Sequence, residues 1–152
     1  MNYWLMKSEP DAFSIDDLKH KTIEPWDGVR NYQARNMLRD QMQIDDQAFF
    51  YHSNCRNPGI VGIMEITKVG YPDSTAFDPS SQYFDPSGNP ENPRWYRVDV
   101  SFIKKFSRII SLDELKRHPL LQTMQAARKG NRLSITSVSL EEWQVIISLA
   151  EG

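Results

Sequence analysis

The segment QAFFYHSNCRNPGIVGIMEITKV (residues 47–69) determines the predicted fold. Its two ends, residues 47–53 and 60–69, are rich in the aromatic and β-branched side chains that favour strands. Residues 54–59 between them hold two asparagines, a proline and a glycine, which are typical of a turn. The sequence therefore predicts two strands joined as a hairpin, and the rest of an antiparallel sheet is built outward from them.

Further strands are predicted on both sides of this hairpin. Residues 3–7 form a first strand, which ends before Pro10 because proline forces its predecessor out of helical geometry. Residues 94–106 alternate so that two aromatic residues and two valines share one face, the pattern of a half-buried strand. A short last strand is expected over residues 133–138.

Helices are predicted from capping boxes, in which a serine and an acidic residue three positions later satisfy free backbone donors at a helix start. Such boxes begin at Ser14, Ser111 and Ser139, so helices are expected over residues 15–20 and from about residues 112 and 140. Another helix is expected over residues 29–41, after a turn at residues 26–28. Helices that interrupt mostly antiparallel strands predict an α+β fold, a small barrel with helices at its rim.

The composition predicts one globular domain over residues 1–152. Apolar residues make up 39% and charged residues 25% of the chain, which allows one core. Cys55 stands alone, so no intrachain disulfide can form, and a reducing, cytoplasmic environment is expected. No leader peptide and no run that could cross a bilayer is found, so no membrane association is expected. A monomer is the favoured state.

Positive charge is local on this slightly acidic chain, whose formal net charge is −2. That balance disfavours a protein that coats nucleic acid by bulk electrostatic attraction. Residues 115–140 nevertheless hold five lysines and arginines and no acidic residue. Arg30, Arg35 and Arg39 form a second group. Each group is either a solvated surface or a binding surface for an anion.

Residues 70–93 form a long segment with five prolines. A connection of this length inside a compact domain is usually functional or disordered. Its aromatic residues, Tyr71, Phe77, Tyr83 and Phe84, predict an ordered loop that packs over another part of the molecule.

Sequence motifs for common enzyme chemistry are absent. There is no glycine-rich phosphate loop, Gly-x-Ser-x-Gly elbow or His-Glu-x-x-His pair, so no cofactor is predicted. With three histidines and one thiol, a zinc site would need distant carboxylates, and no metal is predicted. His52 with Glu9 or Asp99 has the residue types for acid–base catalysis. A strand-end histidine beside Ser53 and Asn54 is more often a polar pocket wall.

The segment WDGVRNYQARN (residues 26–36) is the densest in polar and aromatic residues. On the predicted helix, Asn31, Arg35 and Arg39 share one face at i, i+4, i+8 spacing, and the two arginines repel each other. A phosphate would satisfy this face, because guanidinium groups bind its oxygens bidentately and the helix N-terminus adds donors. The alternative is that carboxylates of the protein satisfy the arginines: Asp27, Asp40 or Asp99.

Trp26 is expected in the turn ahead of that helix, where a large ring is easily left half exposed. A core tryptophan is the ordinary explanation. Stacking of a base on an exposed aromatic face, however, contributes roughly 1–3 kcal/mol per base and does not depend on base identity. Selectivity would then come from polar groups that read the base edge, and four residues have suitable donors and acceptors: Glu9, Asn31, Ser53 and Asn54.

Together these segments resemble the EVE domain family. In chain order the similarity is carried by YWLMKSEP (residues 3–10), WDGVRNYQARN (26–36), FYHSN (50–54), YPD and FDP (71–73 and 77–79), RW and VDV (94–95 and 98–100), and LS and EW (133–134 and 142–143). These motifs run through nearly the whole chain, and the second is long and unusual enough to be highly specific.

The resemblance implies a PUA-like fold: a small, mostly antiparallel β-barrel with flanking helices, related to the YTH domain that holds methylated adenine in RNA. It also implies a reader module that is not an enzyme and that holds a flipped, modified base. Methylated or hydroxymethylated cytosine in DNA is the expected base, and a modified RNA base is an alternative. Trp26 would be one wall of the pocket, and Phe77 or Tyr83 a second.

The expected base pocket comprises Lys7, Ser8, Glu9, Trp26, Val29, Asn31, Tyr32, His52, Ser53, Asn54, Phe77 and Tyr83. Phosphate binding is expected at Arg30, Arg35 and Arg39. A second hypothesis is a nuclease or nucleotide hydrolase on the same barrel, with His52 and Lys7 acting on a phosphodiester or glycosidic bond. A pocket for a small metabolite is a third.

Overall fold

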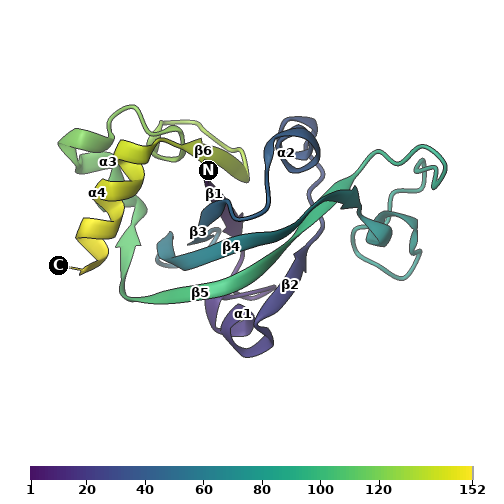
Figure 1. Cartoon of the computed structure of the whole chain (residues 1–152), viewed down its shortest axis with the longest axis horizontal. Helices are drawn as coiled ribbons and strands as arrows, with labels where there is room; N and C mark the ends of the chain where they lie inside the picture. The colour runs from purple at the N-terminus through teal and green to yellow at the C-terminus, as the bar shows by residue number, and fades with distance from the viewer. Residues whose placement is uncertain (152) are drawn as a thin grey trace.

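The computed structural model describes residues 1–151 and contains one six-stranded sheet, in the order β2-β5-β4-β3-β1-β6. The strands are β1 (Tyr3–Ser8), β2 (Ile23–Trp26), β3 (Gln47–His52), β4 (Gly59–Pro72), β5 (Tyr96–Ser111) and β6 (Ile135–Val138). In Figure 1, α3 and α4 lie at one end of the molecule, and the loop between β4 and β5 extends from the other. This loop, residues 73–95, is called the long loop below.

The sheet is mostly antiparallel, as predicted, but it is open and not closed into the predicted barrel. β2 and β6 form its two edges, and each pairs with one neighbour. Both edge strands are only four residues long, so they offer few backbone groups for a closing ladder. β1 and β3 pair in parallel, and residues 9–46 make the long crossover that such a pair requires.

The α-helices are α1 (Ile15–Lys21), α2 (Tyr32–Asn36), α3 (Leu112–Arg117) and α4 (Leu140–Glu151). Capping by Ser14, Ser111 and Ser139 is confirmed, because each hydroxyl accepts a hydrogen bond from the backbone three residues on. Four short turns complete the set: the π-helical η1 (Met37–Gln41) and the 3-10 turns η2 (Ser74–Phe77), η3 (Pro119–Leu121) and η4 (Gln125–Ala127). No helix in residues 1–151 is long and apolar enough to span a bilayer.

Two hydrophobic clusters pack on opposite faces of the sheet. The first includes Met6 of β1 and buried side chains of α1, α2 and η1. The second includes Leu5 of β1 and buried side chains of α3 and α4. Because side chains alternate along a strand, these two neighbouring residues of β1 face different clusters.

Candidate nucleic-acid interface

The end of β1 meets the end of β3 and brings together four residues expected in the base pocket. The Ser53 backbone N–H donates to the Ser8 carbonyl oxygen at 3.0 Å, and the Ser8 hydroxyl donates to the Phe13 carbonyl oxygen at 2.6 Å. The Asn54 side-chain amide donates to the Glu9 carboxylate at 2.6 Å. Ser8 and Ser53 therefore support the backbone, whereas Glu9 and Asn54 are exposed and retain polar atoms for a ligand.

Lys7 faces away from the other pocket candidates. Met6 belongs to the same cluster as Trp26, whereas the Lys7 ammonium lies 5.5 Å from the ring centroid of Tyr51 in the second cluster. Burial lowers the pKa of Lys7. Its backbone N–H donates to the Ser134 carbonyl oxygen at 2.8 Å. Lys7 is therefore placed beside the segment that leads into β6, on the opposite face of the sheet from Trp26.

His52 supports the start of α1. Its Nε2 accepts a hydrogen bond from the Ile15 backbone N–H at 3.1 Å, so the basic nitrogen is already in use. Burial lowers the pKa of His52, which favours the same neutral form. Asp99, a candidate partner of this histidine, accepts a hydrogen bond from the Tyr71 hydroxyl instead. The hydrolase hypothesis therefore lacks the free, carboxylate-oriented base that it needs.

Trp26 is the last residue of β2, and only 7% of its surface is exposed. Its ring meets the Phe50 ring edge-on, with centroids 5.4 Å apart. Val29 is equally buried at 7%. The expectation of a half-exposed indole in a turn is therefore wrong. The reason is that Trp26 pairs with Val98 in the sheet, and its side chain joins the first cluster.

The ring of Tyr83 lies directly on the backbone of Gly28. Gly28 has a φ of +79°, and a β-carbon added there would meet three Tyr83 ring atoms at 2.6 to 2.8 Å. Only glycine therefore fits beneath the ring. Phe77, the other candidate for a second wall, packs on Gly88 within the long loop. Of the two, Tyr83 is the one that contacts the segment after Trp26.

Asp27 is a carboxylate whose charge is poorly compensated. Its side chain is 35% exposed, and its nearest cation is Arg97, at 3.8 Å from Nη1 to Oδ2. Burial raises the pKa of Asp27, the negative charge of Asp73 raises it further, and Arg97 acts in the opposite direction. A partly exposed carboxylate with a perturbed pKa is a candidate for ligand binding.

Asp73 organises the start of the long loop from a fully buried position. Its carboxylate accepts from the backbone N–H groups of Gly28 and Thr75 at 2.9 and 3.0 Å, and from Arg30 at 3.0 Å. Burial acts to raise the pKa of Asp73, but the hydrogen bonds from Thr75, Gly28 and Arg30 together lower it. The carboxylate is therefore charged at neutral pH and ties the long loop to the segment after β2.

All five N–H donors of Arg30 are paired within the protein. Nη1 donates to Val29 and Asp73, both at 3.0 Å. Nε and Nη2 donate to the Tyr83 carbonyl oxygen at 3.2 and 2.7 Å, and Nη2 also donates to the Thr75 hydroxyl at 3.3 Å. The prediction that Arg30 binds phosphate is thereby corrected. This guanidinium fixes the long loop, and its partner Asp73 is not one of the three carboxylates named from the sequence.

The other two arginines of the predicted phosphate face are partly engaged. Arg35 donates to the Arg94 carbonyl oxygen at 2.8 Å. Arg39 donates to both carboxylate oxygens of its neighbour Asp40 at 2.8 Å. Arg39 is therefore neutralised locally by one of the three carboxylates named as alternatives, and Arg35 keeps donors of its Nη2 group free among residues 1–151.

Asn31 and Tyr32 mark the start of α2, three residues later than predicted. The Asn31 side chain caps the helix by accepting from the Ala34 backbone N–H at 3.0 Å. Tyr32 is 54% exposed and stacks on Trp95 with centroids 5.0 Å apart. The Arg35 guanidinium lies 4.9 Å from the Tyr32 ring centroid. An exposed aromatic ring beside a cation is thus present here, although Asn31 is used for capping.

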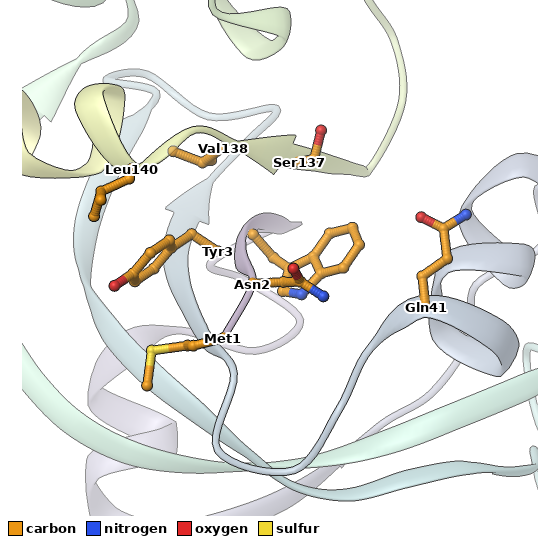
Figure 2. Close-up of a pocket in the computed structure, with 8 residues that line it drawn as sticks. Met1, Asn2, Tyr3, Gln41, Ser137, Val138 and Leu140 are labelled. Atoms are coloured by element: carbon orange, nitrogen blue, oxygen red, sulfur yellow. The ribbon is translucent and has the colours of Figure 1, made fainter.

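Two hollows lie away from these residues. One, of about 460 Å³, lies between the start of β1 and β6 (Figure 2) and is lined by Met1, Asn2, Tyr3, Trp4, Gln41, Ser137, Val138 and Leu140. The other, of about 430 Å³, is lined by His118, Leu120, Glu141, Gln144, Val145, Ser148 and Leu149. Neither hollow includes a residue of the predicted base pocket. At the predicted site, the Tyr83 ring covers the backbone of Gly28.

Sequence reasoning missed the roles of Asp27, Gly28 and Asp73. The sequence predicts Gly28 only in a turn, Asp27 in that turn or as a partner of the arginines, and Asp73 only as part of a motif. A signal was available, because an Asp-Gly pair often marks a glycine with positive φ. Within residues 1–151, no group of three or more candidate ligand side chains is arranged to hold a metal ion.

Comparison with known proteins shows the family of this chain. The model of the EVE domain family matches residues 2–149. This chain belongs to the EVE domain family. Mouse thymocyte nuclear protein 1 is 47% identical over 170 residues, which cover 99% of this chain and 74% of that protein.

Solved structures of other family members match this EVE domain closely. A crystal structure of a protein from Pseudomonas syringae is 48% identical with a TM-score of 0.94, and covers 97% of this chain and 99% of that chain. Human THYN1 protein, solved in complex with DNA containing 5-methylcytosine, is 44% identical with a TM-score of 0.94. That match covers 100% of this chain and 99% of the human one. These neighbours support the EVE, PUA-like fold for the open sheet.

Proposed function

We propose that this EVE domain binds DNA and holds one flipped, modified cytosine at Gly28, between the Trp26 segment and Tyr83. The contact that carries the proposal is the Tyr83 ring on Gly28, because it shows that a flat ring fits directly on this backbone. The human relative bound to 5-methylcytosine DNA supports the choice of base, since it matches over the whole chain.

The base enters when the Tyr83 ring moves. Arg30 holds the main-chain carbonyl of Tyr83, so the loop backbone stays in place while the side chain rotates. Rotation of a side chain is faster than movement of a loop backbone. The base then occupies the place on Gly28, and the Tyr83 ring stacks on its outer face. The buried Trp26 forms the floor beside the base and not an open wall.

Polar side chains at the same place select cytosine. The Asp27 carboxylate accepts a hydrogen bond from the exocyclic amine of cytosine, which thymine lacks. The hydrogen-bonded pair of Glu9 and Asn54 is a further candidate for reading the base edge. A methyl group buried in an apolar corner adds about 0.8 kcal/mol, which corresponds to about fourfold in affinity. The preference for the modified base is therefore modest.

Matched DNA duplexes test this function. Duplexes that differ only in carrying cytosine, 5-methylcytosine or 5-hydroxymethylcytosine at one position are titrated at low salt, with fluorescence anisotropy as the readout. The modified duplex is expected to bind a few-fold more tightly. A 2-aminopurine next to the target base is expected to brighten as the base leaves the stack. Equal affinities and unchanged fluorescence would contradict the proposal.

Variants of the long loop separate stacking from stability. Tyr83→Ala removes the ring from Gly28 and is expected to remove the preference for the modified duplex. Phe84→Ala is the matched control, because Phe84 is the next residue, is 38% exposed and is not the ring that covers Gly28. Trp26→Ala is a poor test, because truncation of a buried tryptophan costs about 3–5 kcal/mol of stability.

We infer binding without catalysis from the state of His52, whose Nε2 accepts from the backbone of α1. Incubation of the protein with labelled DNA and RNA checks this inference. No cleavage is expected. If the protein cleaves either substrate and His52→Gln abolishes that cleavage, the hydrolase hypothesis replaces the reader function.

A further inference from the structure

The segment before β6 carries three exposed cations without an internal partner. Arg128, Lys129 and Arg132 are exposed, and none of them forms an ion pair within residues 1–151. They lie in the stretch 115–140, which contains no acidic residue. The sequence left two interpretations for this group, and the absence of local carboxylates favours the anion-binding one. Residues 128–132 are called the basic loop below.

The basic loop has a defined shape. The Asn131 side-chain amide donates to the Gln125 carbonyl oxygen at 2.7 Å, and its oxygen accepts from the Leu133 backbone N–H at 2.9 Å. Gly130 makes the turn with a φ of +80°, and the space around it is open. The cations therefore extend from a turn held by hydrogen bonds, which reduces the entropy lost when they bind a ligand.

The basic loop lies next to the end of β1. The Lys7 backbone N–H donates to the carbonyl oxygen of Ser134, two residues beyond the loop. β1 pairs there with β6, the edge strand into which the basic loop leads, so Lys7 and the basic loop lie side by side at this edge of the sheet.

We propose that the basic loop, together with Lys7, binds phosphates of the bound DNA. The proposal rests on the proposed function, and it moves the phosphate contacts from Arg30 and Arg39, which are paired internally, to this surface. Free cations on one short turn complement a row of phosphates, and arginine binds phosphate oxygens bidentately. An anionic lipid surface is disfavoured, because the loop has no apolar side chain that would insert between lipids.

A charge-neutralising variant tests the proposal. The triple variant Arg128→Gln, Lys129→Gln, Arg132→Gln is compared with Lys19→Gln, Lys104→Gln, Lys116→Gln. This control removes equal charge from exposed lysines on α1, β5 and α3 that form no ion pair within residues 1–151. Affinity for the 5-methylcytosine duplex and its cytosine match is measured from 50 to 200 mM salt. Loss of two to three phosphate contacts should reduce the slope of log affinity against log salt by about 2 to 3. The affinity of the loop variant for both duplexes should fall by the same factor, roughly tenfold or more at 50 mM salt.

The outcomes distinguish this proposal from the base-reading function. If the wild type prefers the modified duplex but the slope of the loop variant equals that of the control, the basic loop is not the phosphate site. If the slope falls but neither protein prefers the modified duplex, the phosphate site stands and base reading fails. A wild type that binds no DNA overturns both. Loss of binding to phosphatidylserine vesicles, with DNA affinity unchanged, would identify the loop as a lipid surface and also overturn the proposal.

Discussion

At the residue scale, Asp27 shows how a site side chain can act against stability. Its carboxylate is partly buried and lies near the charge of Asp73, and only a long contact to Arg97 compensates it. Because the folded pKa is raised, the folded state binds the proton more readily than the unfolded chain does. The cost of the charge is therefore present at neutral pH and disappears as the pH falls below the ordinary aspartate pKa.

Asp27→Asn is accordingly expected to stabilise the protein at pH 7, with a rise in Tm of roughly 1–3 °C. The gain should shrink toward pH 3. The same variant should reduce the preference for cytosine over thymine at the target position, because asparagine can donate to the thymine oxygen. Thermal melts at both pH values and duplex titrations provide the measurements. Asp11→Asn, at an exposed position without an ion pair in residues 1–151, should change neither quantity.

Single residues were predicted well where local chemistry decides their role and poorly where tertiary pairing does. The capping serines follow from spacing alone, and all three cap as expected. Arg30 and Trp26 were misjudged, because their partners are supplied by segments far away in the sequence. Asp73 and Tyr83 bind Arg30 from more than 40 positions away, and β5 fixes the orientation of Trp26.

At the scale of elements, a short, partly buried ion pair between Asp73 and Arg30 ties down the long loop. The charge of Asp73 is buried, and only 23% of the Arg30 side chain is exposed. Removal of one partner from such a pair leaves the other uncompensated, at a cost of about 3–5 kcal/mol for full burial. The Tyr83 carbonyl oxygen is bonded to the same guanidinium. The position of the Tyr83 ring should therefore depend on Asp73.

Asp73→Asn is expected to destabilise the protein by about 3 kcal/mol and to expose the long loop to proteases. Urea denaturation and limited proteolysis measure the two effects. Asp78→Asn serves as the control, because this exposed carboxylate in the same loop bonds only to Ser80. If both variants resist protease like the wild type, the pair does not control the loop.

Most elements were predicted because each has its own pattern. The hairpin of β3 and β4 and the half-buried start of β5 agree with the structure. β2 was missed because it is short and contains Pro25, which is tolerated only because β2 is an edge strand. The helix expected over residues 29–41 begins after Asn31 and changes to a π-helical turn at Met37. Closure of the sheet cannot be predicted from such patterns, because it depends on pairing between distant edges.

At the scale of the whole molecule, stability should fall with acid. The pKa values of Asp73, Asp85 and Glu114 are lowered in the folded state: hydrogen bonds lower those of Asp85 and Glu114, and for Asp73 they outweigh burial. Depressed carboxyl pKa values stabilise the fold above the ordinary carboxyl range, and this contribution is lost as the pH falls through about 4. Burial also lowers the pKa of His52, so the unfolded chain binds a proton at this residue more readily than the folded state does. The free energy of unfolding should therefore begin to fall as the pH drops below about 6.5.

Tm measured from pH 7 to pH 3 should therefore decline slightly below about pH 6.5 and steeply below about pH 4. His52→Gln should remove the first decline and leave the second. A Tm that stays constant down to pH 3 would show that these carboxyl groups have ordinary pKa values in the folded protein.

The opposite directions of Leu5 and Met6 on β1 have a mechanical consequence. The helices of both clusters pack on the same sheet. Unfolding of one cluster therefore exposes strands whose other face supports the second cluster. The protein should melt in a single cooperative transition, with equal calorimetric and van 't Hoff enthalpies. A substitution that disturbs the core beneath α4 should therefore also affect the residues around Gly28, because the same strands support both regions.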